Sequence, residues 1–272
     1  MGLNGAVRMP DPAVPPDAAG PFDFTRVSTP TDAVRTIDLV ERIWGGSAGV
    51  DVNTLIALDH SDNYVMLAER DGDAVAVGIA FCGPPRSRNL HSHIVGASVP
   101  GAGRALKYHQ RDWCRERGIE TITWTFDPLI ARNAWFNLGV LGARPVEYLV
   151  DHYGRMDDGL NAGQPSDRLL VSWPVATDPG LPTLEPEVGR IALPDDLEQI
   201  RRTDPDAALD WRLRVREQFA ELIASGHDVI GFARPDSNRG GEYLLARSTQ
   251  SPTLRFHPAP ATARAAQERP SA

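Results

Sequence analysis

The sequence predicts an α/β protein in which a mixed central sheet carries helices on both faces. Segments that alternate apolar and polar residues, as strands do, are interleaved with segments whose apolar residues recur at helical spacing. Two strand–helix–strand units follow one another between residues 90 and 150, which is typical of α/β folds. A hairpin sequence at Asp71-Gly72-Asp73 adds antiparallel pairing, so the sheet should be mixed.

The region before residue 90 begins with a tail and continues with helices and a hairpin. Its N-terminus is rich in proline, alanine and glycine, which predicts disorder. Thr29-Pro30 is a helix-start sequence, and the spacing in the helix that follows predicts that Val34, Ile37 and Val40 are buried. The expected segments are a disordered tail at 1–21, a strand at 22–28, helices at 31–44 and 51–59, and strands at 64–70 and 74–81.

A strand, a turn and a helix occupy residues 90 to 118. The strand covers 90–97, Gly101 and Gly103 form the turn, and Gly118 ends the helix. A strand that enters a helix through a Gly-x-Gly turn directs backbone N–H groups and the helix dipole at one spot, which suits a phosphate group. The same sequence also forms simple tight connections.

Further strands and helices follow residue 118. The later elements are expected at 120–126 (strand), 130–138 (helix), 143–150 and 168–173 (strands), 195–202 and 206–224 (helices), and 227–234 and 242–247 (hairpin). Proline-rich stretches predict unstructured chain between and after them. The chain therefore divides into a tail at 1–21, a main domain at 22–174, a linker at 175–194, a helix–hairpin extension at 195–247 and a disordered tail at 248–272.

Composition narrows the function classes. The 272-residue chain has a net charge of −8, and its 28 basic residues form no cluster of the kind that binds nucleic acid. No apolar run reaches membrane-spanning length, and the N-terminus lacks the apolar core of a signal peptide. Cys82 and Cys114 do not have metal-ligand spacing. We expect a cytoplasmic protein with no metal, nucleic-acid or membrane partner, and a homodimer is compatible with the sequence.

Several motifs in residues 22–173 occur in the order found in one known superfamily. They are the two helices after the first strand, the 71–73 hairpin, the Gly-x-Gly turn leading into Arg104-Ala105-Leu106, Asn133-Ala134, and the turn Leu141-Gly142-Ala143. This pattern resembles the GNAT superfamily of acyl-CoA-dependent acyltransferases. The segments HSH, TFDPL, RNAWFNL and PSDRLLV are similar to a GNAT-like group of unassigned function whose chain continues into a helix–hairpin extension.

The resemblance implies a transferase, an N-acyltransferase that uses acetyl-CoA or another acyl-CoA as co-substrate. In the superfamily the pantetheine arm enters a V-shaped gap between two strands, and the amino group of the acceptor attacks the thioester directly. Here the pyrophosphate would bind around Gly101, Ala102, Gly103 and Arg104, and Asn133 would approach the arm. The implied acceptor is a small-molecule amine.

Departures from the family pattern leave a second reaction class open. Ser98 stands where the family has Arg or Gln, the loop is several residues shorter, and Pro100 has no N–H to offer. By spacing from Gly142, Leu138 takes the place of the tyrosine that often serves as the acid. The alternative is a GNAT-fold enzyme repurposed for a non-acetylating reaction, such as decarboxylation or a tailoring step in specialised metabolism. A non-catalytic ligand-binding protein is a third hypothesis.

Histidine, aspartate and tyrosine side chains are the candidates for proton transfer. His91 and His93 share one face of a strand, and an imidazole can accept a proton from an ammonium group near neutral pH. Hydrogen-bonded core histidines would show the same spacing. Asp127 ends a strand, where it either faces the ligand crevice or caps the next helix. Tyr153, like Tyr148, is a candidate replacement acid or a packed phenol.

Overall fold

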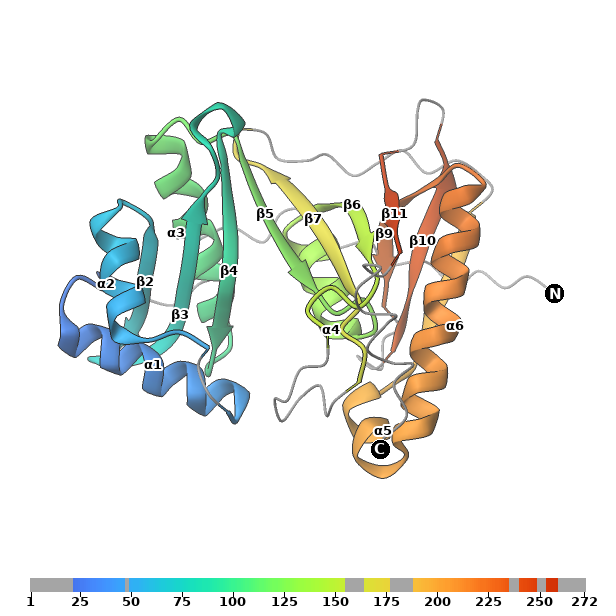
Figure 1. Cartoon of the computed structure of the whole chain (residues 1–272), viewed down its shortest axis with the longest axis horizontal. Helices are drawn as coiled ribbons and strands as arrows, with labels where there is room; N and C mark the ends of the chain where they lie inside the picture. The colour runs from blue at the N-terminus through green and yellow to red at the C-terminus, as the bar shows by residue number, and fades with distance from the viewer. Residues whose placement is uncertain are drawn as a thin grey trace, which may run out of the picture.

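The computed structural model describes residues 22–46, 49–154, 164–176, 188–234, 240–248 and 253–258. Their strands form an eight-stranded sheet and a three-stranded sheet (Figure 1). In spatial order the larger sheet contains β1 (Asp23–Arg26), β2 (Tyr64–Arg70), β3 (Asp73–Cys82), β4 (Asn89–Ala97), β5 (Thr121–Phe126), β7 (Arg168–Pro174), β6 (Arg144–Leu149) and β11 (Arg255–His257). The smaller sheet contains β8 (Val188–Leu193), β10 (Gly241–Arg247) and β9 (His227–Ala233).

Helices cover both faces of the larger sheet. On β2, Val65 and Leu67 belong to one apolar cluster with α1 and α2, whereas Ala68 packs in another cluster with Leu106 of α3. This alternation follows from the two-residue period of a strand. The helices are α1 (Pro30–Trp44), α2 (Val52–His60), α3 (Ala102–Glu116), α4 (Ala131–Ala134) with a π-helical turn at Trp135–Val140, α5 (Leu197–Thr203) and α6 (Pro205–Ala224).

The larger sheet is mixed. Neighbouring strands from β1 to β4 run antiparallel, as do β5, β7 and β6, whereas the β4–β5 and β6–β11 pairs are parallel. The predicted fold class, an α/β arrangement with a mixed sheet and helices on both faces, is therefore confirmed. None of the helices in the described ranges is long and apolar enough to cross a membrane.

β4 and β5 pair over only a short distance. Their parallel ladder ends at His91 and Thr123. Beyond that pair, β4 continues to Ala97 beside β3, and β5 continues to Phe126 beside β7. Figure 1 shows the two strands diverging along their length. The sheet is therefore opened in its middle while each strand remains paired on its outer side.

The first helix buries the predicted stripe except at Val34, since Val40 is buried and Ile37 packs against the same cluster. α1 buries Ala33 and Val40 as part of this stripe, whereas Val34 is 48% exposed. The packing of Trp44 explains why Val34 is exposed. The Trp44 ring lies 2.2 Å from the position that a Cβ on Gly96 would occupy. Only a glycine in β4 allows this approach, and the contact turns the stripe that contains Trp44 toward the sheet.

Two strands occur where the sequence predicted unstructured chain. β8 lies in the expected linker at 175–194 and pairs with β10. β11 lies in the expected disordered tail at 248–272, where Phe256 stacks on Tyr148 of β6 with ring centroids 5.3 Å apart. Both predictions are wrong in these parts, because a short strand depends on a partner that is distant in sequence. The expected tail at 1–21 and residues 177–187 and 259–272 lie outside the described residues.

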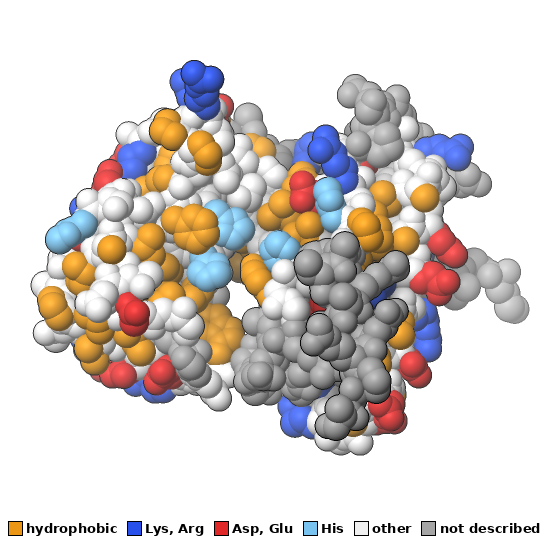
Figure 2. All heavy atoms as spheres, viewed as in Figure 1, with side chains coloured by type: hydrophobic (Ala, Val, Ile, Leu, Met, Phe, Trp, Pro, Cys, Tyr) orange, Lys and Arg blue, Asp and Glu red, His pale blue; other side chains and the backbone are white. Residues whose placement is uncertain are grey.

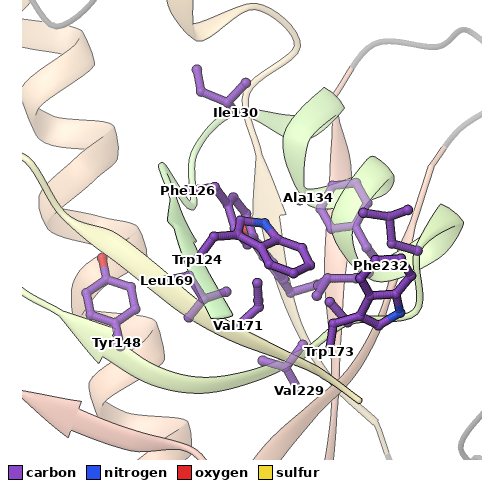
Figure 3. Packing of buried hydrophobic residues seen from close by; sticks show 14 of the residues in the cluster. Trp124, Phe126, Ile130, Ala134, Tyr148, Leu169, Val171, Trp173, Val229 and Phe232 are labelled. Carbon is purple, nitrogen blue, oxygen red and sulfur yellow. The ribbon is translucent and has the colours of Figure 1, made fainter. Parts of the chain in front are cut away.

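A large apolar core lies beneath β5 and β7 and extends to the smaller sheet. Trp124 and Trp173 meet edge to face, with ring centroids 6.1 Å apart (Figure 3). Phe232 and Tyr243 of the smaller sheet belong to the same cluster, and their rings also meet edge to face. The two sheets therefore share one core.

A buried ion-pair group attaches α5 and α6 to the end of β5. The Asp127 carboxylate accepts hydrogen bonds from Arg201 at 2.6 Å and from Arg212 at 2.8 Å. All three side chains are buried. Burial alone would raise the pKa of Asp127, but the positive charges of Arg212 and Arg201 outweigh it and hold the pKa well below its usual range. The carboxylate is thus fully engaged in joining the C-terminal helices to the main sheet.

We expect Asp127→Asn to lower the free energy of unfolding by about 3–5 kcal/mol, because two buried guanidinium groups lose their counter-charge. Denaturant unfolding would measure the change. The matched control is Glu242→Gln, which removes the carboxylate of an exposed ion pair with Arg190 and should cost less than about 1 kcal/mol. Equal effects of the two substitutions would contradict the structural role of Asp127.

Candidate functional site

At the opening, successive side chains of β4 and β5 point to opposite faces of the sheet and so form two sets. Ser92 and Trp124 face α3, since Lys107 of that helix donates a hydrogen bond to Ser92 Oγ at 2.9 Å and lies 3.6 Å above the Trp124 ring. His91 and His93 face the opposite side, where both rings lie beside Phe81, and Thr123 contacts His91 there. That side is the one against which α1 and α2 pack. We call it the histidine face.

An aromatic cluster lies on the histidine face. The Phe81 ring of β3 lies 5.2 Å from the His91 ring and 5.8 Å from the His93 ring, and the two imidazoles are 6.3 Å apart. Phe81 is 40% exposed. Figure 2 shows histidine side chains gathered with hydrophobic ones near the middle of this side of the molecule. The structure places both histidines on one face, as the sequence predicted, and their chemical role stays a prediction.

β4 has a bulge at His93. Its register with β3 passes directly from Ile94 to Ser92, so His93 has no cross-strand partner. Bulges redirect side chains and are frequent beside active sites. Within the described part of the chain, the exposed His93 ring forms no hydrogen bond. Its nitrogens are therefore available to a ligand.

Both imidazoles favour the neutral form. Burial lowers the pKa of His91, and the charges of His93, Lys107 and His152 lower it further. Partial desolvation by the neighbouring side chains also lowers the pKa of His93, although part of its ring is exposed. A neutral imidazole can accept a proton, so the environment suits a general base.

Tyr153 lies on the same face. Its hydroxyl shares a hydrogen bond of 3.0 Å with Thr125 Oγ1, and His91 Nδ1 lies 3.4 Å from Thr123 Oγ1. The two threonines are neighbours on one face of β5. The His152 ring lies 4.5 Å from the Tyr153 ring. Thr123 contacts the histidine candidate and Thr125 contacts the tyrosine candidate, so both candidates lie along the same face of β5.

Asp127 does not join this group. The carboxylate that the sequence predicted as catalytic is buried in its pairs with Arg201 and Arg212, and Asp127 also caps the following turn through the Leu129 N–H. A carboxylate held by two guanidinium groups cannot act as a base near neutral pH, because its charged form is strongly favoured. The catalytic assignment of Asp127 is therefore withdrawn in favour of a structural one.

The start of α3 retains the features expected of an anion site. Gly101 has the left-handed φ of 86° that ends the turn, and Ala105 makes the first helical hydrogen bond, to Gly101. The N–H groups of Ala102 and Gly103 precede that bond in the first turn, where N–H groups have no acceptor within the helix. No acidic residue lies in the first turn. These residues fit the pyrophosphate of an acyl-CoA, with Pro100 contributing no donor.

The predicted contact for the pantetheine arm lies in α4. Asn133 is half-buried, and its side chain makes no hydrogen bond to the residues that the structure describes. In the chain, β5, which borders the opening, lies between α3 and this helix. Asn133 and the α3 turn are thus compatible with one elongated ligand.

Three residues at the opening were not singled out from the sequence. Phe81 and His152 become neighbours of the histidines only through strand pairing and the turn after β6. Lys107 carries one signal, because it is the only lysine of the chain. Being the only lysine does not show that Lys107 is buried, because its burial depends on the strands beneath α3.

No protein-family model and no curated protein matches the chain. Among solved structures, the ribosomal-protein-S18-alanine N-acetyltransferase from Escherichia coli is similar, with 15% identity and a TM-score of 0.47 over 60% of this chain and 100% of that one. A GNAT-family acetyltransferase from Streptococcus pneumoniae has 11% identity and a TM-score of 0.46, over 57% of this chain and 99% of its own. A Salmonella typhimurium protein described as a candidate acetyltransferase, solved with its cofactor acetyl-CoA, has 15% identity and a TM-score of 0.45, over 58% and 97%. With these scores below 0.5, we base the function on this chain's own geometry.

We expect His91 and His93 to titrate below about pH 6.5, the usual midpoint of an imidazole, because burial favours the neutral ring. NMR of histidine-labelled protein would follow both rings, with His91→Phe and His93→Phe for assignment. Since the unfolded chain then binds more protons, the free energy of unfolding should decrease as the pH falls through this range. A midpoint above 6.5 for either ring would contradict the described environment.

Proposed function

We propose that the protein is an acyl-CoA-dependent N-acyltransferase that acts on the amino group of a small molecule. The observation that carries the proposal is the opening of the sheet where the β4–β5 ladder ends at His91 and Thr123, with a free histidine beside it. This opening would admit a thioester-bearing arm between the strands. The sequence resemblance described above supports the same activity.

Different residues around the opening would bind different parts of the acyl-CoA. The N–H groups at the start of α3, together with Arg104, would hold the pyrophosphate through the helix dipole and charge. Asn133 would contact the arm. An acyl-CoA supplies an acyl group that is already activated for attack. The chain must therefore supply mainly alignment of the amine and proton transfer.

His93 is the better of the two candidate bases. An amine is an ammonium ion near neutral pH and must lose a proton before it can attack. His93 is exposed, lies at the β4 bulge and favours its neutral form, whereas His91 is less exposed and lies beside Thr123. Tyr153, through its bond to Thr125, would help to orient the acceptor on the histidine face.

A GNAT-fold enzyme with a non-acetylating reaction is the alternative. Pro100 and the short turn before α3 favour it, because they remove donors from the pyrophosphate site. Consumption of acyl-CoA without formation of an acylated amine would identify this alternative. Binding of no CoA ester would reject the acyltransferase proposal and favour the other hypotheses.

We expect acetyl-CoA to stabilise the protein by about 2.7 kcal/mol at a hundredfold excess over its Kd, since it binds only the folded chain. Thermal unfolding with acetyl-CoA, other acyl-CoA esters and free CoA would measure this effect. Arg104→Glu should weaken it by placing a negative charge at the start of α3. Arg115→Glu makes the same charge change in the last turn of α3 and should leave binding unchanged. Equal losses in both variants would contradict the site at the helix start.

We expect His93→Ala to lower turnover about 100-fold while leaving acetyl-CoA binding intact, because the substitution removes the base but not the pyrophosphate site. Release of CoA with a panel of small amines would be measured. His60→Ala, in the last turn of α2, is the control and should retain full activity. An unchanged rate in His93→Ala would reject this residue as the base.

A further inference from the structure

The only lysine of the chain is buried at the opening of the sheet. Lys107 is 3% exposed, yet it lies near the start of α3 rather than in a surface turn. Its ammonium group donates to Ser92 Oγ at 2.9 Å, approaches Gln110 Oε1 at 3.5 Å and lies 3.6 Å above the ring of Trp124. Long cationic side chains are almost never fully buried without a partner, so this position requires an explanation.

No carboxylate in the described ranges pairs with Lys107. Its hydrogen-bond partners are neutral, and the titratable groups that act on it or respond to it are the Cys114 thiol of α3 and His91 of β4. Burial raises the pKa of Cys114 to about 12, so that thiol stays neutral. Burial lowers the pKa of Lys107 to about 7. The group can therefore hold or release a proton near neutral pH.

Lys107 lies at the point where the strands separate. Its contacts Ser92 and Trp124 are the residues that directly follow His91 and Thr123, the last pair of the β4–β5 ladder. Both contacts face α3, so the amine lies on the side of the sheet opposite to the histidine face. A base and a second ionisable group thus lie on the two sides of one opening.

The α3 side is also the side from which the expected acid is missing. Trp124 Nε1 donates to Asn137 Oδ1 in the π-helical turn at 3.0 Å, so this turn and Lys107 contact the same indole. The next residue, Leu138, is buried in the same apolar cluster as Trp124 and cannot donate a proton. Tyr153 cannot simply replace it on this side, since its hydroxyl bonds to Thr125 on the histidine face.

We propose that Lys107 is the acid that protonates the departing thiolate of the acyl-CoA, from the side of the sheet opposite to His93. The inference rests on the proposed acyltransferase function. As the bond between the amine nitrogen and the acyl carbon forms, the C–S bond breaks and its electron pair leaves on sulfur. His93 takes the ammonium proton first and, after its release to solvent, the second proton that the nitrogen loses as the amide forms, and the Lys107 ammonium gives its proton to the sulfur. Exchange with solvent then restores both groups.

The single lysine allows a direct test on the full chain. Protein grown with 13Cε-labelled lysine gives one side-chain Cε signal, so its titration needs no assignment. We expect a midpoint near pH 7 in the free protein. Saturation with CoA, whose sulfur can ionise, should raise the midpoint by at least one pH unit relative to saturation with desulfo-CoA, because a neighbouring thiolate favours the ammonium form. The desulfo compound matches CoA in size and controls for the loss of solvent.

Each outcome decides the proposal. A free midpoint near 10.4, the usual value for lysine, would overturn it. So would equal midpoints with CoA and desulfo-CoA when thermal unfolding shows that both bind. Failure of both compounds to bind would instead reject the acyltransferase function, and this inference with it. The measurement uses the unmodified chain, so it does not depend on a buried substitution being tolerated.

Discussion

The end of the β4–β5 ladder at His91 and Thr123 is the constraint on which the rest of the site depends. While two strands pair, the side chains on their two faces are separated by backbone. Once the pairing stops, groups from both faces border the same opening. The period of two then decides which residues do so, with His93 on one side and Ser92 on the other. A site of this kind is built on strands rather than on loops, which favours precise positioning.

Keeping the strands apart requires separate support for each one. β4 is held by its ladder to β3 and by the close contact of Trp44 with Gly96. β5 is held by β7, by the edge-to-face contact of Trp124 with Trp173, and by the Asp127 ion pairs at its end. The C-terminal helices therefore support the opening although they contribute no side chain to it. Their removal would leave the buried Asp127 carboxylate without its ion pairs to Arg201 and Arg212.

Local rules explain what could be predicted from the sequence. The two-residue spacing of His91 and His93 predicts a shared face, and the Gly-x-Gly turn predicts the start of α3, because both depend only on neighbouring residues. The partners of Asp127 lie 74 and 85 residues away, so its local position could indicate a cap or a site but not an ion pair. β11 is defined by its parallel partner β6. The burial of Lys107 could not be predicted for the same reason. It depends on Ser92 of β4 and Trp124 of β5, which the sequence pattern of the helix does not reveal.

The two sides of the opening hold groups whose protonation states complement each other. Burial lowers the pKa of both kinds of group from different ordinary values, to about 7 for Lys107 and to below the ordinary value of an imidazole for His91 and His93. The charge of Lys107 itself contributes to lowering the pKa of His91. There is thus a range of pH in which the His93 imidazole is neutral and Lys107 carries its proton. A tyrosine, with an ordinary pKa of about 10, would hold its proton more firmly than this lysine. Burial lowers the pKa of the only lysine to about 7 and therefore provides an acid matched to neutral pH, and among the described residues no carboxylate pairs with it to offset this effect.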